Sequence, residues 1–209
     1  MVNKTISQKK KEKLSRKIDS RGPSKLSKPR IAPLDKSKWN EDVLALLGNY
    51  EKINKRPVPN IFKTLANHPK LYKRWAVFGN HVLLKSSLPA RDREILILRI
   101  GWLCQSIYEW GQHVVIGKQC GLTTEDFRRI AEGPDAKGWD PFEATLLRAV
   151  DELYVDSFIR DSTWNALAEL YNTHQLMDVI FTVGQYNLVS MALNTLGVQP
   201  EKELEGFPK

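Results

Sequence analysis

The chain is predicted to fold as an all-α domain of about seven or eight helices, and three observations predict this. From Trp39 onward, apolar residues recur at intervals of three and four, which is the period of a helix face. Helix start and stop residues bound several of these segments. No segment joins strict apolar and polar alternation to hairpin turn residues. The 209 residues, 42% of them hydrophobic, suffice for one principal domain.

The predicted helices follow one another with short connections. Segments 44–47, 61–65 and 71–82 have helical spacing, and Pro89 precedes the run 91–103. Thr123 is a predicted N-cap with acids in the first turn, and Asp140 is another, with proline at the next position. Asp161 or Ser162 starts a helix through residue 170. The last helix, 175–196, is expected to stop at Gly197, and the loop 132–138 interrupts the domain.

The run 91–120 is too long for a typical globular helix and is expected to contain an internal stop. Ser106 and Glu109 have the spacing of a capping box, in which a hydroxyl and a carboxylate bond each other's backbone amides. Ser106 would then begin a second helix. Two interpretations of this pair remain open, because the residues can close a helix end only or take part in a site.

The positive charge of the chain is concentrated near its start. Residues 1–40 contain thirteen Lys or Arg and three Asp or Glu, a net charge of +10, so the remainder has a net charge of −2. We therefore expect a basic, disordered tail over 1–40, a helical domain over 41–200 and a short tail over 201–209. The basic tail could contact nucleic acid or an anionic surface through nonspecific charge.

The sequence predicts a cytoplasmic protein with no membrane span. The lysine-rich start has no apolar core of a signal peptide, and the apolar stretch 95–104 is about half the length that a membrane helix requires. Neither a metal nor a cofactor is expected, since His68, His81 and His174 have no paired ligand spacing.

Ser106, Glu109 and His113 are the most informative residues, because three- and four-residue intervals place them on one helix face. A hydroxyl, a carboxylate and an imidazole gathered in this way indicate an acid/base site.

Three segments of this chain resemble the carboxymuconolactone decarboxylase superfamily. They are NIFKTLANHP at 60–69, LPARDREILILR at 88–99 and YEWGQH at 108–113, with Gly121 and Leu122 following. The similarity covers residues 58 to about 198. It implies an all-helical fold and one of two chemistries, which are cofactor-free decarboxylation of a carboxylated muconolactone or hydroperoxide reduction by a Cys-x-x-Cys pair.

The redox branch of the superfamily has a glutamate ahead of Cys-x-x-Cys-x-x-x-His. When its histidine is matched to His113, the glutamate falls on Glu94 and the two cysteines fall on Ser106 and Glu109. Both thiols are missing, whereas Glu109 and His113 match the Glu-x-x-x-His spacing of the decarboxylase branch. Cys104 and Cys120 are interpreted as reduced thiols, with a one-cysteine peroxidase using Cys104 as the alternative.

The expected roles follow from residue chemistry. His113 is the expected base, since its ordinary pKa lies near neutrality, and Glu94 or Glu109 would orient it and stabilise the imidazolium. Arg99 would hold the substrate's anionic group, unless it forms a buried ion pair. Contacts with the substrate are also expected from Ser106 and Asn194.

The sequence therefore predicts a cofactor-free acid/base enzyme acting on a small anionic organic substrate. Family resemblance further implies a homo-oligomer, a dimer, trimer or hexamer. The alternatives are a redox enzyme of the alkylhydroperoxidase D type without its usual dithiol, and a noncatalytic binding or scaffold protein.

Overall fold

The computed structural model describes residues 26–208, and within this range it contains helices and no strand. Seven helices have eight or more residues: α5 (Pro69–Asn80), α6 (Ala90–Leu103), α7 (Ile107–Gln119), α8 (Thr124–Glu132), α9 (Pro141–Asp156), α10 (Asp161–Ala168) and α11 (Thr173–Leu196). The shorter elements are η1 (Lys36–Lys38), α2 (Glu41–Leu47), α3 (Tyr50–Asn54), α4 (Asn60–Leu65) and the π-helical turn η2 (His81–Lys85). The predicted all-α fold is confirmed.

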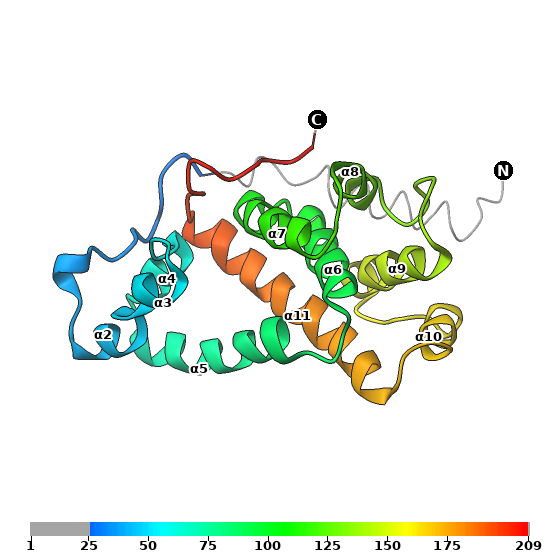
Figure 1. Ribbon diagram of the computed structural model, residues 1–209, viewed down its shortest axis with the longest axis horizontal. Helices are drawn as coiled ribbons and strands as arrows, with labels where there is room; N and C mark the ends of the chain where they lie inside the picture. The colour runs from blue at the N-terminus through cyan, green and yellow to red at the C-terminus, as the bar shows by residue number, and fades with distance from the viewer. Residues whose placement is uncertain (1–25, 209) are drawn as a thin grey trace.

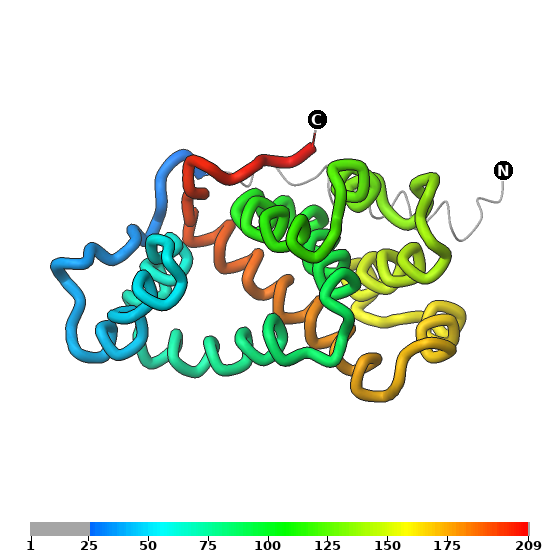
Figure 2. The backbone as a smooth tube through the Cα atoms, in the orientation of Figure 1, coloured from blue at the N-terminus to red at the C-terminus, as the bar shows by residue number. Residues whose placement is uncertain are grey.

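Helix α6 lies at the centre of the fold. It packs mainly against α7, α9 and α11, and α11 crosses the molecule diagonally between α5 and the α6–α7 pair (Figure 1). Helices α2 to α4 gather at one end and α8 to α10 at the other, as the backbone trace also shows (Figure 2).

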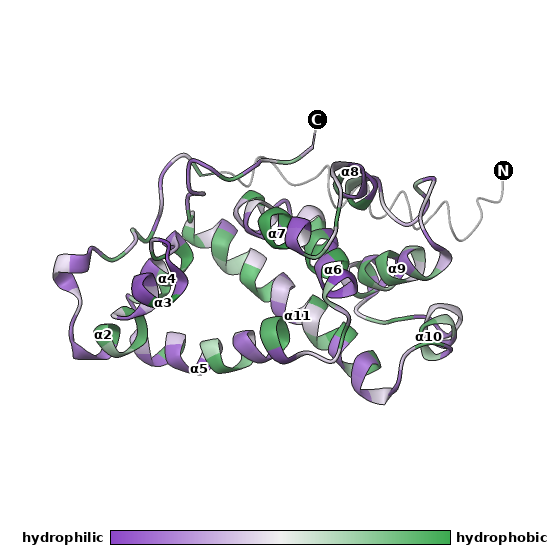
Figure 3. Cartoon of the chain, in the orientation of Figure 1, coloured by the Kyte–Doolittle hydropathy of each residue, from purple (hydrophilic) through white to green (hydrophobic). Residues whose placement is uncertain are grey.

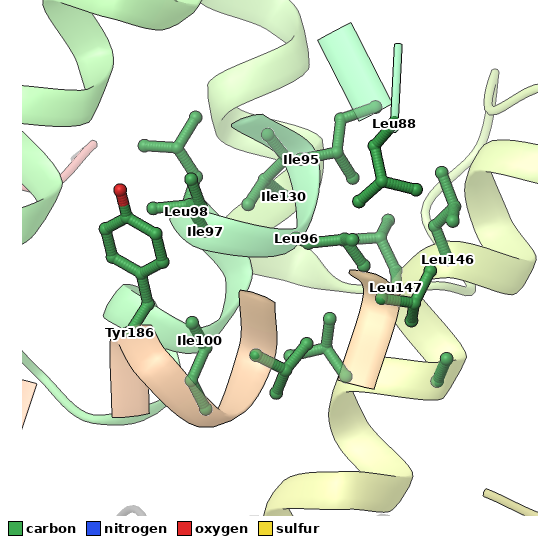
Figure 4. Close-up of a cluster of buried hydrophobic side chains, with 14 of the residues drawn as sticks. Leu88, Ile95, Leu96, Ile97, Leu98, Ile100, Ile130, Leu146, Leu147 and Tyr186 are labelled. Atoms are coloured by element: carbon green, nitrogen blue, oxygen red, sulfur yellow. The ribbon is translucent and has the colours of Figure 1, made fainter. Parts of the chain in front are cut away.

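The centre of the core is built from the run 95–98 of α6, whose four side chains are completely buried. Figure 4 shows them between aliphatic side chains of α8 and α9, with Tyr186 of α11 at the margin and its hydroxyl directed away from the cluster. A helix that is apolar all round must be buried on every side. The next residue, Arg99, is charged and is also buried.

Helix ends are set by local chemistry at most of the predicted positions. Thr123 forms a capping box with Asp126, and the Asp140 carboxylate accepts from the amide of Phe142. Gly197 ends α11 at a φ of 70°, a conformation that glycine adopts without strain.

The junction of α6 and α7 differs from its prediction. Ser106 does precede α7, but its side chain makes no capping hydrogen bond, so the predicted capping box with Glu109 is wrong. The chain turns instead through backbone bonds: the amide of Gln105 donates to the Trp102 carbonyl and that of Ser106 to the Gly101 carbonyl, both at 2.9 Å. This is the Schellman arrangement, with Gln105 in the left-handed region at a φ of 52°.

Helix α11 has one buried side and one exposed side without charge. Met177, Phe181, Leu188 and Met191 are exposed, and Phe181 contacts Phe78 of α5 edge to face. Figure 3 shows hydrophobic turns along this helix that alternate with paler and hydrophilic ones. By length and composition alone α11 could cross a membrane, but half of its most apolar window is buried inside the fold, as in a central helix of a helical domain.

Both predicted tails contain residues that pack on the domain. Residues 1–25 lie outside the described part, but Leu34 and Trp39 pack against the small cluster formed by α2, α4 and α5. At the other end, Phe207 stacks edge to face on Trp102 at 4.9 Å. The Glu201 carboxylate accepts from the Tyr108 hydroxyl at 3.0 Å. A few apolar and charged side chains therefore hold segments whose overall composition is polar.

Candidate functional site

The imidazole of His113 lies between two carboxylates that come from different helices. Its Nδ1 is 2.7 Å from Oε2 of Glu94 on α6, and its Nε2 is 3.0 Å from Oε1 of Glu109, one turn earlier on α7. All three side chains are at least 94% buried. The structure thus brings together the three residues that the sequence predicts to be catalytic.

The two carboxylates are held differently. Glu94 uses both oxygens, because Nε of Arg93 donates to its Oε1 at 3.0 Å. Apart from the 3.0 Å contact with His113, no described residue donates a hydrogen bond to the carboxylate of Glu109. A Cβ at Gly101 would lie 3.6 Å from Cγ of Glu109, an ordinary contact distance, so α6 packs closely against α7 at this position. Glu94 is therefore fixed, whereas Glu109 keeps acceptor capacity.

The environment changes the protonation of His113. Burial lowers the pKa of the imidazole, but the negative charges of Glu94 and then Glu109 outweigh it and raise the pKa from 6.5 to about 10. At neutral pH the ring is an imidazolium. The role of a base, expected from the ordinary pKa of histidine, requires a neutral ring, so this geometry favours a proton donor instead.

Tyr186 of α11 forms a wall of the same site. Its ring packs edge to face on the imidazole, with centroids 4.8 Å apart and an interplanar angle of 84°. Burial and the charges of Glu109 and Glu94 raise the pKa of its hydroxyl, which stays protonated. The tyrosine therefore contributes a neutral hydroxyl beside the charged cluster.

Ser106 is completely buried, and its Oγ has no hydrogen-bond partner among the described residues. It stands at the start of α7, one turn before Glu109. A buried hydroxyl without a partner is unusual in a folded protein, and it retains the capacity to bond a ligand.

Arg99 and Asn194 make other contacts. Nε and Nη2 of Arg99 bond the two oxygens of Asp151 at 2.7 and 3.1 Å, and Nη1 bonds the carbonyls of Ile130 and Ala131. The alternative of a buried ion pair thus describes Arg99, and its expected role in substrate binding is not supported. The amide of Asn194 donates to the Cys104 carbonyl at 2.8 Å, which joins α11 to the end of α6.

The two cysteines lie in different surroundings. The buried Cys104 donates from Sγ to Oδ1 of Asn187 at 3.1 Å. Burial and the charge of Glu94 raise the pKa of the Cys120 thiol, although Arg93 acts in the opposite direction. A raised pKa disfavours the thiolate that redox catalysis needs.

Within residues 26–208, no group of three or more His, Cys, Asp or Glu side chains is arranged to hold a metal ion. The imidazole nitrogens are instead turned toward carboxylates.

Arg93 and Tyr186 are two members of the site that the sequence does not single out. The position of Arg93 directly before Glu94 is the one signal that could have indicated it. The contact between Tyr186 and His113 joins residues 73 positions apart, which no local pattern reveals.

Comparison with solved structures identifies the fold. An uncharacterized peroxidase-related protein from Ralstonia eutropha JMP134, described as an alkylhydroperoxidase AhpD core, superposes with a TM-score of 0.74 at 18% identity, covering 84% of this chain and 93% of that one. One from Silicibacter sp. TM1040 gives 0.69 at 16%, covering 88% and 94%. A variant of the debrominase Bmp8, in complex with 2,3,4-tribromopyrrole, gives 0.68 at 12%, covering 84% and 94%.

At these identities the likeness concerns the fold alone. No curated protein matches the chain significantly. The sequence of residues 69–152 matches the Carboxymuconolactone decarboxylase family, and this segment holds Glu94, Glu109 and His113. The family match over residues 69–152 and the shared all-helical fold are both consistent with the resemblance to the carboxymuconolactone decarboxylase superfamily.

Proposed function

We propose that this protein is a cofactor-free enzyme that transfers protons on a small anionic organic substrate, by decarboxylation, isomerisation or proton transfer in a lactone or oxo acid. The observation that carries the proposal is the imidazole of His113 between two buried carboxylates. Such an arrangement supplies a proton donor and a proton acceptor side by side in a buried site.

The contacts divide the work among the three groups. Glu94 is fully bonded and orients the ring, so it is a positioning residue. His113, charged at neutral pH, donates a proton from Nε2. Glu109 has unused acceptor capacity and takes a proton from the substrate.

In a decarboxylation, the bond between the carboxyl carbon and its neighbour breaks, and its electron pair stays on the substrate as CO₂ leaves. The resulting carbanion takes the proton of His113, which regains one from water. In an isomerisation, Glu109 removes a proton from carbon and His113 returns one to another atom. The proton on Glu109 then passes to Nε2 of His113, 3.0 Å away, which restores both groups. Neither path needs an oxidant, a reductant or a thiol.

The surroundings of the cysteines favour this proposal over the redox alternative. Ser106 and Glu109 stand at the two positions where the redox branch carries its thiols, and neither can form a sulfur nucleophile. The thiol of Cys120 has a raised pKa. The fold that this chain shares with peroxidase-related proteins is compatible with both chemistries.

The test is proton NMR in D₂O with a panel of carboxylated lactones and short oxo acids. Wild-type protein is expected to exchange a carbon-bound proton for deuterium, or to release CO₂, with at least one of them. We expect Glu109→Gln and His113→Gln to slow this reaction by roughly 10²- to 10⁴-fold. The double variant Cys104→Ala/Cys120→Ala serves as the thiol control and should react at the wild-type rate.

Two results would contradict the proposal. Activity that disappears in the thiol control would favour the redox alternative. A wild-type protein that neither exchanges nor converts any compound, while still binding members of the panel, would favour a noncatalytic binding protein.

The proposal includes assembly of several copies, as the family resemblance implies. Light scattering during size exclusion should then give a mass that is a multiple of 24.0 kDa. A mass of one chain at micromolar concentration would remove this part of the proposal and leave the chemistry unaffected.

A further inference from the structure

Arg93 is the one arginine of α6 whose terminal nitrogens, Nη1 and Nη2, make no hydrogen bond with a described residue. Its Nε donates to Oε1 of Glu94 at 3.0 Å, and no described residue bonds its Nη1 or Nη2. The guanidinium of Arg91 instead bonds Glu143 and the Gly121 carbonyl, and that of Arg99 is fully engaged. Only 13% of the Arg93 side chain is exposed.

Nη1 and Nη2 of Arg93 are not among the buried polar atoms without a partner, so this edge of a mostly buried side chain is open to solvent and to a ligand. Arginine presents its N–H groups in a rigid planar fork, and the edge formed by Nη1 and Nη2 matches the two oxygens of a carboxylate. Because Nε already holds Glu94, the orientation of that edge is fixed before any ligand arrives.

Arg93 belongs to the same site as His113. Oε1 of Glu94 accepts a hydrogen bond from Arg93, and Oε2 contacts His113. The carboxylate of Glu94 therefore lies between the two positively charged groups. The charge of Arg93 also reaches Tyr186, whose hydroxyl has a pKa raised by burial and by Glu109 and Glu94 but lowered by Arg93. Without a ligand, the two cations balance the two carboxylates.

We propose that the Nη1 and Nη2 edge of Arg93 binds a carboxylate of the substrate in a bidentate manner, so that Arg93 takes the role that the sequence suggested for Arg99. This inference rests on the proposed function for the identity of the ligand as a substrate. It names the substrate class: a short organic carboxylate whose reacting carbon lies within reach of Nε2 of His113 when its carboxylate bonds Arg93.

The test uses a matched pair of planar probes, furan-2-carboxylate and its neutral counterpart furan-2-carboxamide, titrated by protein NMR. Wild-type protein should bind the carboxylate roughly 10- to 100-fold more tightly than the amide, the preference expected for hydrogen bonds between charged groups. The Nε–H signal of Arg93 should shift with the carboxylate only.

Three variants separate charge, shape and general effects. Arg93→Gln should remove the preference for the carboxylate. Arg93→Lys keeps the charge without the fork and should bind roughly tenfold more weakly than wild type. Arg91→Gln changes the same charge on the same helix, at a guanidinium that is already bonded, and should stay within about twofold of wild type. If Arg93→Gln does not fold, the lysine variant carries the comparison.

The inference is overturned if Arg93→Gln or Arg93→Lys binds the carboxylate as wild type does, or if wild type binds both probes equally or neither. It is independent of turnover, because Glu109→Gln should still bind the carboxylate. If binding follows Arg93 while no variant of His113 alters any reaction, the inference stands and the proposed function fails.

Discussion

The burial of an imidazolium between two carboxylates makes the stability of this protein depend on pH in a way that can be measured. Folding raises the pKa of His113 from 6.5 to about 10, because the charges of Glu94 and Glu109 outweigh the effect of burial. The folded state therefore binds this proton more tightly than the unfolded state. The resulting stabilisation is complete below pH 6.5 and is lost as the pH rises through 10.

The size of the effect follows from the shift. Each pKa unit corresponds to about 1.4 kcal/mol, so a rise from 6.5 to about 10 contributes up to about 5 kcal/mol to the free energy of unfolding. Between pH 7 and pH 9 alone, the contribution should fall by about 2 to 3 kcal/mol. That is a large part of the stability of an ordinary domain.

The assay is urea denaturation followed by tryptophan fluorescence, which the six tryptophans provide, at pH values from 6 to 10. His113→Gln removes the titrating group, so the difference between wild type and variant isolates its contribution from that of other residues. We expect this difference to shrink steadily above pH 7. A difference that is independent of pH, or an imidazole NMR signal that titrates near 6.5, would refute the reasoning.

Three further predictions concern packing and the thiols. Arg99→Met leaves Asp151 buried without its cation and should lower the free energy of unfolding by about 3–5 kcal/mol in urea; an unchanged midpoint would show that the pair contributes nothing. Gly117→Ala places a Cβ 2.9 Å from a neighbouring leucine and should lower the free energy of unfolding, measured by thermal melting, by about 1–3 kcal/mol. Gly184→Ala meets no atom within 4 Å and should raise the free energy of unfolding by about 1 kcal/mol. Cys120 should react with iodoacetamide at pH 8 more slowly in the folded than in the urea-unfolded protein, because burial and Glu94 raise the pKa of its thiol; equal rates would contradict that environment.

The fold was predictable where local chemistry decides it. Thr123, Asp140 and Gly197 act within a few residues of their own position, and their helix ends lie where the sequence placed them. At Ser106 the position was correct and the mechanism was wrong. The end of α6 depends on Gln105 in a left-handed conformation. Glutamine rarely adopts this conformation, so the residue type does not predict a helix end at this position.

The site was predictable to the extent that spacing along one helix defines it. Glu109 and His113 are one turn apart, and the resemblance to the family supplied Glu94. The choice among the arginines of α6 was not predictable. Asp151, which engages Arg99, lies 52 residues away in the sequence, so only the folded chain shows that Arg99 is paired and Arg93 is not.

The turn at Gln105 sets the alignment of the whole site. Glu94 precedes it by eleven residues and His113 follows it by eight, which places the two side chains roughly 16 and 12 Å along their helices from the turn. A change of about 10° in the angle between the helices would move Glu94 by roughly 3 Å, more than the length of its bond to His113. The contribution of Glu94 to the pKa of His113 therefore depends on the angle between α6 and α7, and a ligand that alters this angle would change the proton affinity of the imidazole.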